Sequence, residues 1–377
     1  MNSGSSSLKF GLYRVDASGA ERLFSATAQT TAPAAQPDAI AHIKCVLADA
    51  GMPPPQAIGH RIVHGGPALR QHCRIDAAIL RQLHAAAAFA PLHTPAALAL
   101  IGWCRQHFPG LPQVACLDTQ FHAGLPDVAR VLPIAKDLQA QGIQRYGFHG
   151  LSIESVVRQL GSAVPERLVV AHLGHGASIT ALLAGRSIDT SMGMTPSGGV
   201  IMGTRSGDLD PGVLVYLLRE QRFDAAGLEA LLDHGSGLLG ISGLSGDMRL
   251  LHAAAASNPD ASLAIEMFCY SVRKQVAAMS AVLGGLDLLV FTGGIGENDA
   301  PVRAQICAGL AWMGVGQDAS VNVSQDVSQD VSQDAARNQS TGPSGALTTD
   351  GAARCPVRVL ASQEDEQIAR HAWVLLA

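Results

Sequence analysis

The sequence predicts an α/β protein that is built from two related domains. Its 377 residues suffice for two domains of ordinary size. Strand-like runs alternate with alanine- and leucine-rich runs of helical periodicity. Gly4-Ser5-Ser6 opens an apolar strand near the start, and Gly176-Ala177-Ser178 opens another near the middle. This repetition hints at a duplication, although two ordinary Gly-Ser turns would look the same.

The individual elements follow from local patterns along the chain. Strands are predicted over residues 8–15, 168–173, 178–183 and 287–291, and helices over residues 77–90, 96–107, 261–283 and 301–313. Asn298 and Asp299 are candidate N-caps of the last helix, and Gly314 is its expected C′ glycine. Residues 317–351 contain Val-Ser-Gln-Asp three times and predict a solvated surface loop, with a cation-binding Asp ladder as the alternative.

Composition and charge exclude several classes of protein. Hydrophobic residues make up 47% of the chain and charged residues 15%, which excludes a globally disordered protein. A net charge of −5 and an aromatic content of 4% argue against binding to nucleic acid or to an anionic membrane. No apolar run reaches the roughly 18 residues of a membrane span. Seven scattered cysteines without a C-x-x-C pair predict reduced thiols in the cytoplasm.

Three glycine-rich polar segments are candidates for chemistry. Residues 189–212 surround Arg205 with small polar residues, which suits an anion held between a guanidinium and backbone N–H groups; a polar inter-domain loop is the alternative. The segment from His172 to Ser178 follows a strand and predicts a hairpin tip, either a phosphate cradle or a structural turn. Residues 291–298 place glycines between a strand and a helix N-terminus, where a phosphate or nucleotide sugar can bind; a plain strand-to-helix connection is the alternative.

Three shorter polar islands each carry one candidate residue. Arg61 stands at a strand end, Asp118 directly follows an apolar run, and His149 adjoins an aromatic residue. Any one of these alone is more typical of a structural residue than of a catalytic one. The fourteen histidines show neither H-E-x-x-H nor Cys/His clustering, so the sequence makes no case for zinc.

Taken together, eight motifs in chain order resemble those of acetate kinases, the acetokinase family. They are residues 2–9, the Arg61 motif, Pro91-Leu92-His93, the Asp118 motif, residues 146–150, the Arg205 motif, residues 242–249 and residues 293–298. The resemblance implies the fold of acetate and sugar kinases, heat-shock chaperones and actin: two duplicated actin-like (ribonuclease H-like) domains flanking a nucleotide cleft. It places the N-terminal domain at residues 1–121 plus 366–377 and the C-terminal nucleotide-binding domain at residues 122–365.

The resemblance also implies an activity. The family transfers the γ-phosphoryl group of ATP reversibly and in line to acetate, giving ADP and acetyl phosphate, with Mg²⁺ or, in its place, Mn²⁺. Propionate kinase is the nearest alternative, because one methylene changes discrimination by only about 1–3 kcal/mol. A non-catalytic actin-like nucleotide switch is the rival of another class, but a switch needs no carboxylate pocket. The expected assembly is a cytoplasmic homodimer that binds acetate and ATP, without nucleic acid or membrane.

Residue roles carry over position by position from the same resemblance. The expected catalytic residues are Asp118, His149 and Arg205; the substrate residues are Arg61, Val63, Leu92, Phe148 and Pro196; and the metal residues are Asn2 and Glu364. The nucleotide-binding positions are Lys9, His172, Leu173, Gly174, His175, Gly176, Asp247, Met248, Arg249, Gly294, Ile295, Gly296, Glu297 and Asn298. Asp118 matches a position described as a proton donor or acceptor. Because acetate is already ionised at pH 7, we expect Asp118 instead to orient Arg61, Arg205 or metal-bound water.

The sequence departs from the family pattern in four places. His175 stands where the family usually has Asn, so nucleotide affinity is expected to depend on pH near 6–7. Ser197-Gly198 replaces Leu-Glu, and residues 362–365 replace a Thr-Asn-Glu-Glu pattern. The family has a short apolar strand ahead of the residue that matches Asn2, whereas only Met1 precedes it here, and we expect that the start has been placed too late.

Overall fold

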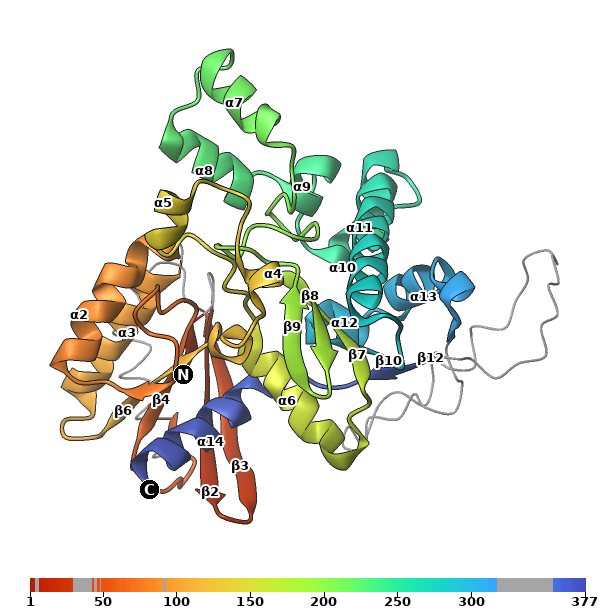
Figure 1. Ribbon diagram of the computed structural model, residues 1–377. Coiled ribbons are helices and arrows are strands. Elements are labelled where there is room, and N and C mark those ends of the chain that lie inside the picture. The colour runs from red at the N-terminus through yellow and green to blue at the C-terminus, as the bar shows by residue number, and fades with distance from the viewer. Residues whose placement is uncertain (4–6, 30–42, 44–45, 48, 91–92, 317–354) are drawn as a thin grey trace.

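The computed structural model describes residues 1–3, 7–29, 43, 46–47, 49–90, 93–316 and 355–377. It contains two halves (Figure 1): the N-terminal half has two three-stranded sheets, and the C-terminal half has one six-stranded sheet. The first Gly-Ser hairpin tip, Leu92 and the predicted loop at 317–351 lie outside the described residues.

The N-terminal half begins with an antiparallel meander of β1 (Asn2–Ser3), β2 (Ser7–Asp16) and β3 (Gly19–Gln29). β4 (Ile58–Ile62) then pairs in parallel with β6 (Gln113–Leu117), and β5 (Cys73–Arg74) pairs with β6 on its other side. Met1 links the two groups, because its ammonium donates to Gly59 O and its carbonyl accepts from the Arg61 N–H, both at 3.0 Å.

The C-terminal half repeats this plan. β7 (Arg167–Leu173), β8 (Ala177–Leu183) and β9 (Arg186–Thr190) form an antiparallel meander. β10 (Leu288–Thr292), β12 (Cys355–Val359) and β11 (Val315–Gly316) continue the sheet in parallel from β7. A meander followed by parallel strands in both halves confirms the predicted duplication of an α/β unit. The domain boundaries at 121 and 366 stay a prediction.

Helices cover the sheets of both halves. Those of the N-terminal half are α2 (Ala77–Ala85), η2 (Ala86–Phe89) and α3 (Thr94–His107). Later in the chain come η3 (Gln120–His122), α4 (Asp127–Arg130), α5 (Lys136–Ala140), α6 (Gly150–Leu160), η4 (Gly161–Ala163), α7 (Pro211–Arg219), α8 (Ala225–His234), α9 (Gly237–Ser242), α10 (Met248–Ala254), α11 (Pro259–Leu283), α12 (Gly293–Asn298), α13 (Ala300–Ala308), η5 (Ala311–Met313) and α14 (Glu364–Leu376). Within the described ranges no helix is both long and apolar enough to cross a bilayer.

Most element predictions are confirmed within a few residues, and two are corrected. The helix predicted over residues 301–313 ends at Ala308 and continues as the separate turn η5. Asn298 lies inside α12 and is no N-cap, whereas the Asp299 carboxylate accepts from the Val302 N–H at 3.0 Å and caps α13. Gly314 has a φ of 82° and ends η5 as a C-cap, which is why glycine is favoured there.

Two packing features position the site. α14 packs on the N-terminal sheet through Ile368 and Ala372, which contact Val114 and Cys116 of β6, and so holds Glu364 at its first turn. A cavity of 670 Å³ continues the line of β1 beyond Met1. It is lined by residues 10–15 of β2 and residues 53–59 leading into β4, with α14 beside them.

Candidate active site

Arg61 and Asp118 form a buried ion pair where β4 and β6 end. Because these strands are parallel and Ile62 lies opposite Leu117, the residues at their carboxyl ends meet at one edge of the sheet. Arg61 donates from Nε at 2.9 Å and from Nη2 at 2.5 Å, both to Asp118 Oδ2. The Asp118 side chain is fully buried, and that of Arg61 is 16% exposed. Two of the predicted site residues are therefore brought into direct contact.

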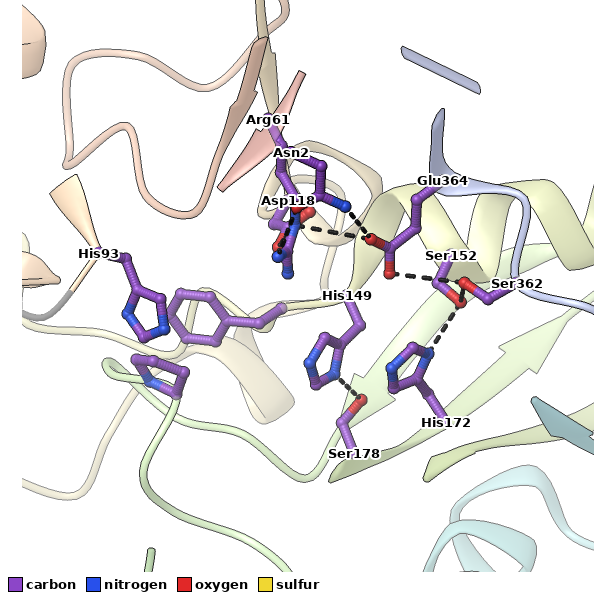
Figure 2. A network of polar contacts seen from close by, with 12 residues as sticks. Asn2, Arg61, His93, Asp118, His149, Ser152, His172, Ser178, Ser362 and Glu364 are labelled. Atoms are coloured by element: carbon purple, nitrogen blue, oxygen red, sulfur yellow. Dashed lines mark hydrogen bonds and ion pairs between the residues drawn. The ribbon is translucent and has the colours of Figure 1, made fainter. Parts of the chain in front are cut away.

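Asn2 and Glu364 complete this cluster from the two ends of the chain (Figure 2). The Asn2 amide donates to Glu364 Oε2 at 3.1 Å, and its oxygen accepts from Arg61 Nη1 at 3.3 Å. Glu364 Oε2 also lies 3.8 Å from Arg61 Nε. One guanidinium thus serves two buried carboxylates, so the cluster carries an excess negative charge.

The pKa values of the two acids shift in opposite directions. Burial raises the pKa of Asp118 from 3.8 to about 6, against the opposing attraction of Arg61, and the repulsion of Glu364 adds to the rise. Burial would also raise the pKa of Glu364, but Arg61 and then His172 outweigh it, so this pKa is lowered. Burial disfavours the charge on Arg61, yet Asp118 and Glu364 raise its pKa above the usual value. All three groups are therefore charged at neutral pH.

This cluster fits a divalent cation. Asp118 Oδ1 is buried and has no hydrogen-bond partner. Carboxylate and amide oxygens from Asn2 and Glu364 lie within the same small space. Hard cations such as Mg²⁺ prefer oxygen ligands of this kind, and a positive ion would offset the excess negative charge.

Two stacked histidines lie beside the cluster. The rings of His149 and His172 are 4.1 Å apart at an interplanar angle of 19°. His149 precedes α6 with a φ of 59°, a left-handed conformation that turns its ring into the site. Its Nδ1 lies 2.9 Å from Ser178 Oγ of β8. Burial, then the neighbouring His172, lowers the pKa of His149 well below its usual value, so the ring is neutral and acts through hydrogen bonds.

Arg205 converges on His149 at the β7–β8 tip. Its Nη1 donates to the Pro196 carbonyl at 3.0 Å. A Cβ on Gly176 would lie 3.3 Å from Arg205 Nη1 and 3.3 Å from His149 Nε2, so both groups face that glycine closely. His93 Nε2 lies 3.4 Å from Arg205 Nη2, and its other ring nitrogen is buried without a partner. His93 was not predicted as a site residue, although it stands in one of the eight motifs.

The predicted apolar pocket is partly described. Val63 is 7% exposed and Phe148 is 1% exposed, and both belong to one core cluster. Pro196 is buried, and its carbonyl holds Arg205. The fourth expected member, Leu92, lies outside the described residues.

Two glycine turns pack against each other at the ends of β7 and β10. Gly293 has a φ of 80°, and a Cβ there would lie 2.8 Å from the Leu173 carbonyl, so only glycine lets the turns approach. Glu297 Oε1 accepts from the Gly293 and Ser362 N–H groups at 2.8 Å, and Asn298 Nδ2 donates to the Gly294 carbonyl at 2.9 Å. Gly296 is buried and Ile295 packs against the same core.

The remaining nucleotide positions differ in exposure. Asp247 caps α10 and binds the exposed Arg249 at 2.6 Å, while Met248 is buried. Lys9 is exposed on β2. Burial lowers the pKa of His175, with Arg205 adding to the effect, so the expected pH dependence moves to lower pH.

A second group of potential ligands, which the sequence did not indicate, lies away from this site. Atoms of His72, Glu154 and His371 lie within 4.8 Å of one another. However, His72 Nδ1 accepts from the Leu117 N–H at 2.9 Å. The neutral ring then carries its hydrogen on Nε2, which leaves no lone pair there for a metal.

Comparison with known proteins identifies the family. The acetokinase family profile matches residues 28–342. The chain belongs to the acetokinase family. It is 43% identical over 324 residues to an acetate kinase of Rhodopseudomonas palustris, covering 85% of this chain and 77% of the relative. Members of this family are phosphotransferases that use a carboxyl group as acceptor, and this chain is such an enzyme.

Solved acetokinase-family structures share the whole fold. The acetate kinase of Porphyromonas gingivalis superposes with a TM-score of 0.79 at 30% identity, covering 100% of this chain and 98% of that one. A propionate kinase of Francisella tularensis superposes with a TM-score of 0.82 at 33% identity and the same coverage. These likenesses confirm the actin-like architecture that the motifs predicted.

Proposed function

We propose that this chain is an acetate kinase that transfers the γ-phosphoryl group of ATP reversibly and directly to acetate. The observation that carries the proposal is the convergence of Arg61, His149 and Arg205 beside a small apolar wall. Arg61 comes from the N-terminal sheet, and the other two come from the C-terminal half. The side chains of Val63, Phe148 and Pro196 are buried and apolar, which suits contact with a short acyl group.

Electrostatics explains why two arginines are needed. Acetate and the γ-phosphate are both anions, and one pair of unit charges about 4 Å apart repels by about 4 kcal/mol at an effective dielectric near 20. Arg61 binds the acetate carboxylate, and Arg205 binds the phosphoryl group being transferred. Phosphoryl transfer depends mainly on positioning and charge stabilisation, which fixed guanidinium groups supply.

His149 and Asp118 have supporting roles. The neutral His149 ring donates a hydrogen bond from Nε2 to an equatorial phosphoryl oxygen, while Nδ1 accepts from Ser178. Asp118 orients Arg61 through its two hydrogen bonds. No base is required, because acetate has already lost its proton at neutral pH.

Asn2 and Glu364 would hold Mg²⁺, in whose place Mn²⁺ also fits. When bound, the ion neutralises phosphate charge. Lys9, the glycine turns at residues 172–176 and 293–298, and residues 247–249 bind ATP and ADP. Backbone N–H groups at such turns suit phosphate oxygens. The proposal includes a cytoplasmic homodimer, which light scattering of the purified chain tests.

The test is hydroxylamine trapping of the acyl phosphate formed with ATP and Mg²⁺ from acetate, propionate and butyrate. We expect the highest kcat/KM with acetate. Propionate kinase is the second candidate, favoured by the likeness to the Francisella tularensis enzyme. A higher kcat/KM for propionate would select it. ATP binding without any acyl phosphate would contradict both and leave a nucleotide switch.

A further inference from the structure

A chain of hydroxyl groups connects Glu364 with His172 behind the reacting groups (Figure 2). Ser362 Oγ lies 3.5 Å from Glu364 Oε1 and 2.9 Å from Ser152 Oγ. Ser152 Oγ in turn lies 2.8 Å from His172 Nδ1. Ser152 is fully buried in α6, so no bulk water replaces these contacts. None of the sequence motifs assigned a role to either serine.

The neighbouring contacts hold this chain in place. The Ser362 N–H donates to Glu297 Oε1 at 2.8 Å. The Gln363 N–H donates to Ser155 Oγ at 3.2 Å, and that hydroxyl donates to the Ser152 carbonyl at 2.7 Å. The segment before α14 is thereby fixed against α6, and the two serine hydroxyls meet in a defined geometry.

The number of available hydrogens sets the direction of the two hydrogen bonds made by Ser152. The Ser362 hydroxyl has one hydrogen, and Ser152 Oγ is the closer of its two acceptors. Once Ser152 accepts from Ser362, its own hydrogen is free to point to His172 Nδ1. A nitrogen that accepts a hydrogen bond carries no hydrogen in the neutral ring, so the hydrogen of His172 lies on Nε2. The ring is neutral near pH 7, since burial lowers the pKa of His172 to about 4.

His172 Nε2 faces the seam between the two glycine turns. A Cβ on Gly293 would lie 3.2 Å from this nitrogen, and one on Gly174 would lie 3.7 Å from it. Both flanking residues are glycines, so no side chain of either turn covers this nitrogen. An N–H directed into this seam would complement an anionic oxygen, whereas a bare nitrogen would repel it.

We propose that Ser152 and Ser362 are positioning residues that hold His172 as its Nε2–H tautomer, so that the ring donates to a phosphate oxygen of the nucleotide. This inference rests on the proposed function, because it assumes that the seam binds nucleotide. Ser152 acts through His172 and touches no reacting atom. Ser362 Oγ also lies 3.5 Å from Glu364 Oε1, so the phosphate seam and the carboxylate cluster are close neighbours.

The first measurement is the tautomer itself, read from two-bond nitrogen–proton correlations of ¹⁵N-histidine-labelled full-length protein at pH 7.5 without metal. The His172 signal is assigned by its loss in His172→Gln. We expect the Nε2–H pattern in wild type, and a mixed pattern in Ser152→Ala and Ser362→Ala. Ser362→Thr keeps the hydroxyl and should restore the wild-type pattern. An Nδ1–H pattern in wild type would overturn the proposal.

The second measurement is the Kd of ADP without metal, by calorimetry. Loss of one well-placed hydrogen bond should weaken ADP binding about tenfold in Ser152→Ala. Ser280→Ala is the matched control, because this buried hydroxyl donates to the Val276 carbonyl of its own helix at 2.8 Å and has no other partner among the described residues. It should leave both the tautomer and the Kd unchanged.

The outcomes separate the inference from the proposed function. An unchanged tautomer and Kd in both Ser152→Ala and Ser362→Ala would refute the positioning role. A changed tautomer with an unchanged Kd would refute the contact between His172 and phosphate. Wild type that binds no ADP would refute the proposed function, while the tautomer spectra would still test the hydroxyl chain.

Discussion

Replacing Asp118 with asparagine should remove one pH dependence of folding stability. The change is nearly isosteric, and the side chain is fully buried, so the amide occupies the space of the carboxylate. An amide oxygen can still accept from Arg61, which donates two hydrogen bonds to this position. What disappears is one negative charge from a cluster in which two carboxylates share one guanidinium.

The size of the effect follows from the shifted pKa. Burial raises the pKa of Asp118 from 3.8 to about 6. The folded protein therefore holds this proton more tightly than the unfolded chain, and the associated stability is complete below about pH 4 and is lost as the pH rises through 6. The difference corresponds to about 3 kcal/mol at 1.36 kcal/mol per pH unit. Between pH 4.5 and 7.5, stability should fall more in wild type than in Asp118→Asn by about 2 kcal/mol, the part of this difference that lies between pH 4.5 and 6.

The assay is urea unfolding of both proteins at intervals across this range. Asp287→Asn is the control, since its hydrogen bond with Arg167 lowers the pKa of Asp287. Asp287 therefore contributes stability that is lost only as the pH falls below about 4, so its replacement should leave the stability change between pH 4.5 and 7.5 as it is in wild type. Parallel stability curves for wild type and Asp118→Asn would show that Asp118 does not carry the raised pKa.

The same variant tests how Asp118 contributes to catalysis. If Asp118 only orients Arg61, its replacement should lower kcat/KM for acetate about 100-fold, as a small misplacement of a binding group does. The chemical step of wild type, isolated in single turnovers, should then show no large solvent isotope effect. A large isotope effect would instead indicate that Asp118 transfers a proton.

Three further predictions concern other parts of the protein. Arg205→Lys should lower kcat about 1,000-fold in the acyl phosphate assay, with little change in the Kd of ADP. Lysine lacks the planar guanidinium, which can bind the Pro196 carbonyl and the phosphoryl group at the same time. A loss of kcat below tenfold would contradict this. Protonation of His175 adds positive charge beside the nucleotide, and burial lowers the pKa of this ring. ADP affinity should therefore rise a few-fold on the acid side of neutral pH, and His175→Asn should abolish that rise in calorimetry. Five apolar residues joined ahead of Met1 would lie between β2 and the segment leading into β4, where the cavity is. Compared with a Gly/Ser extension of equal length, we expect the free energy of unfolding to rise by about 3 kcal/mol and the Tm by about 5 °C. Equal melting temperatures would show that no strand enters there.

Much of the fold could be predicted from local signals. Strands such as β7 and β8 are short apolar runs beside glycine turns, and α11 shows helical periodicity over its whole length. Helix ends were predicted less well, because α13 stops at Ala308 within a continuous apolar pattern. Which strands pair within each half depends on contacts between distant segments, such as β7 with β10, and periodicity does not encode these contacts.

The site residues also differ in how far the sequence could predict them. Arg205 lies in a segment whose composition is unusual and was indicated by it, whereas Arg61 was indicated only by the resemblance to acetate kinases. Ser152 and Ser362 are ordinary serines in ordinary contexts, and only the packing of α14 against α6 brings them to His172. His93 was missed for a related reason, because its partner Arg205 comes from the other half of the molecule.

The charge distribution explains why the two halves need each other. The N-terminal sheet and α14 contribute Arg61, Asp118 and Glu364, a cluster with an excess negative charge that suits a cation. The C-terminal half contributes Arg205 and two histidines that burial keeps neutral, an arrangement suited to a phosphate. Neither half alone balances an acetate and a phosphoryl group. Ser362 and Ser152 join the two groups of residues where the segment before α14 packs on α6, so the cation-binding and phosphate-binding charges lie at one site and together lower the barrier from anion repulsion.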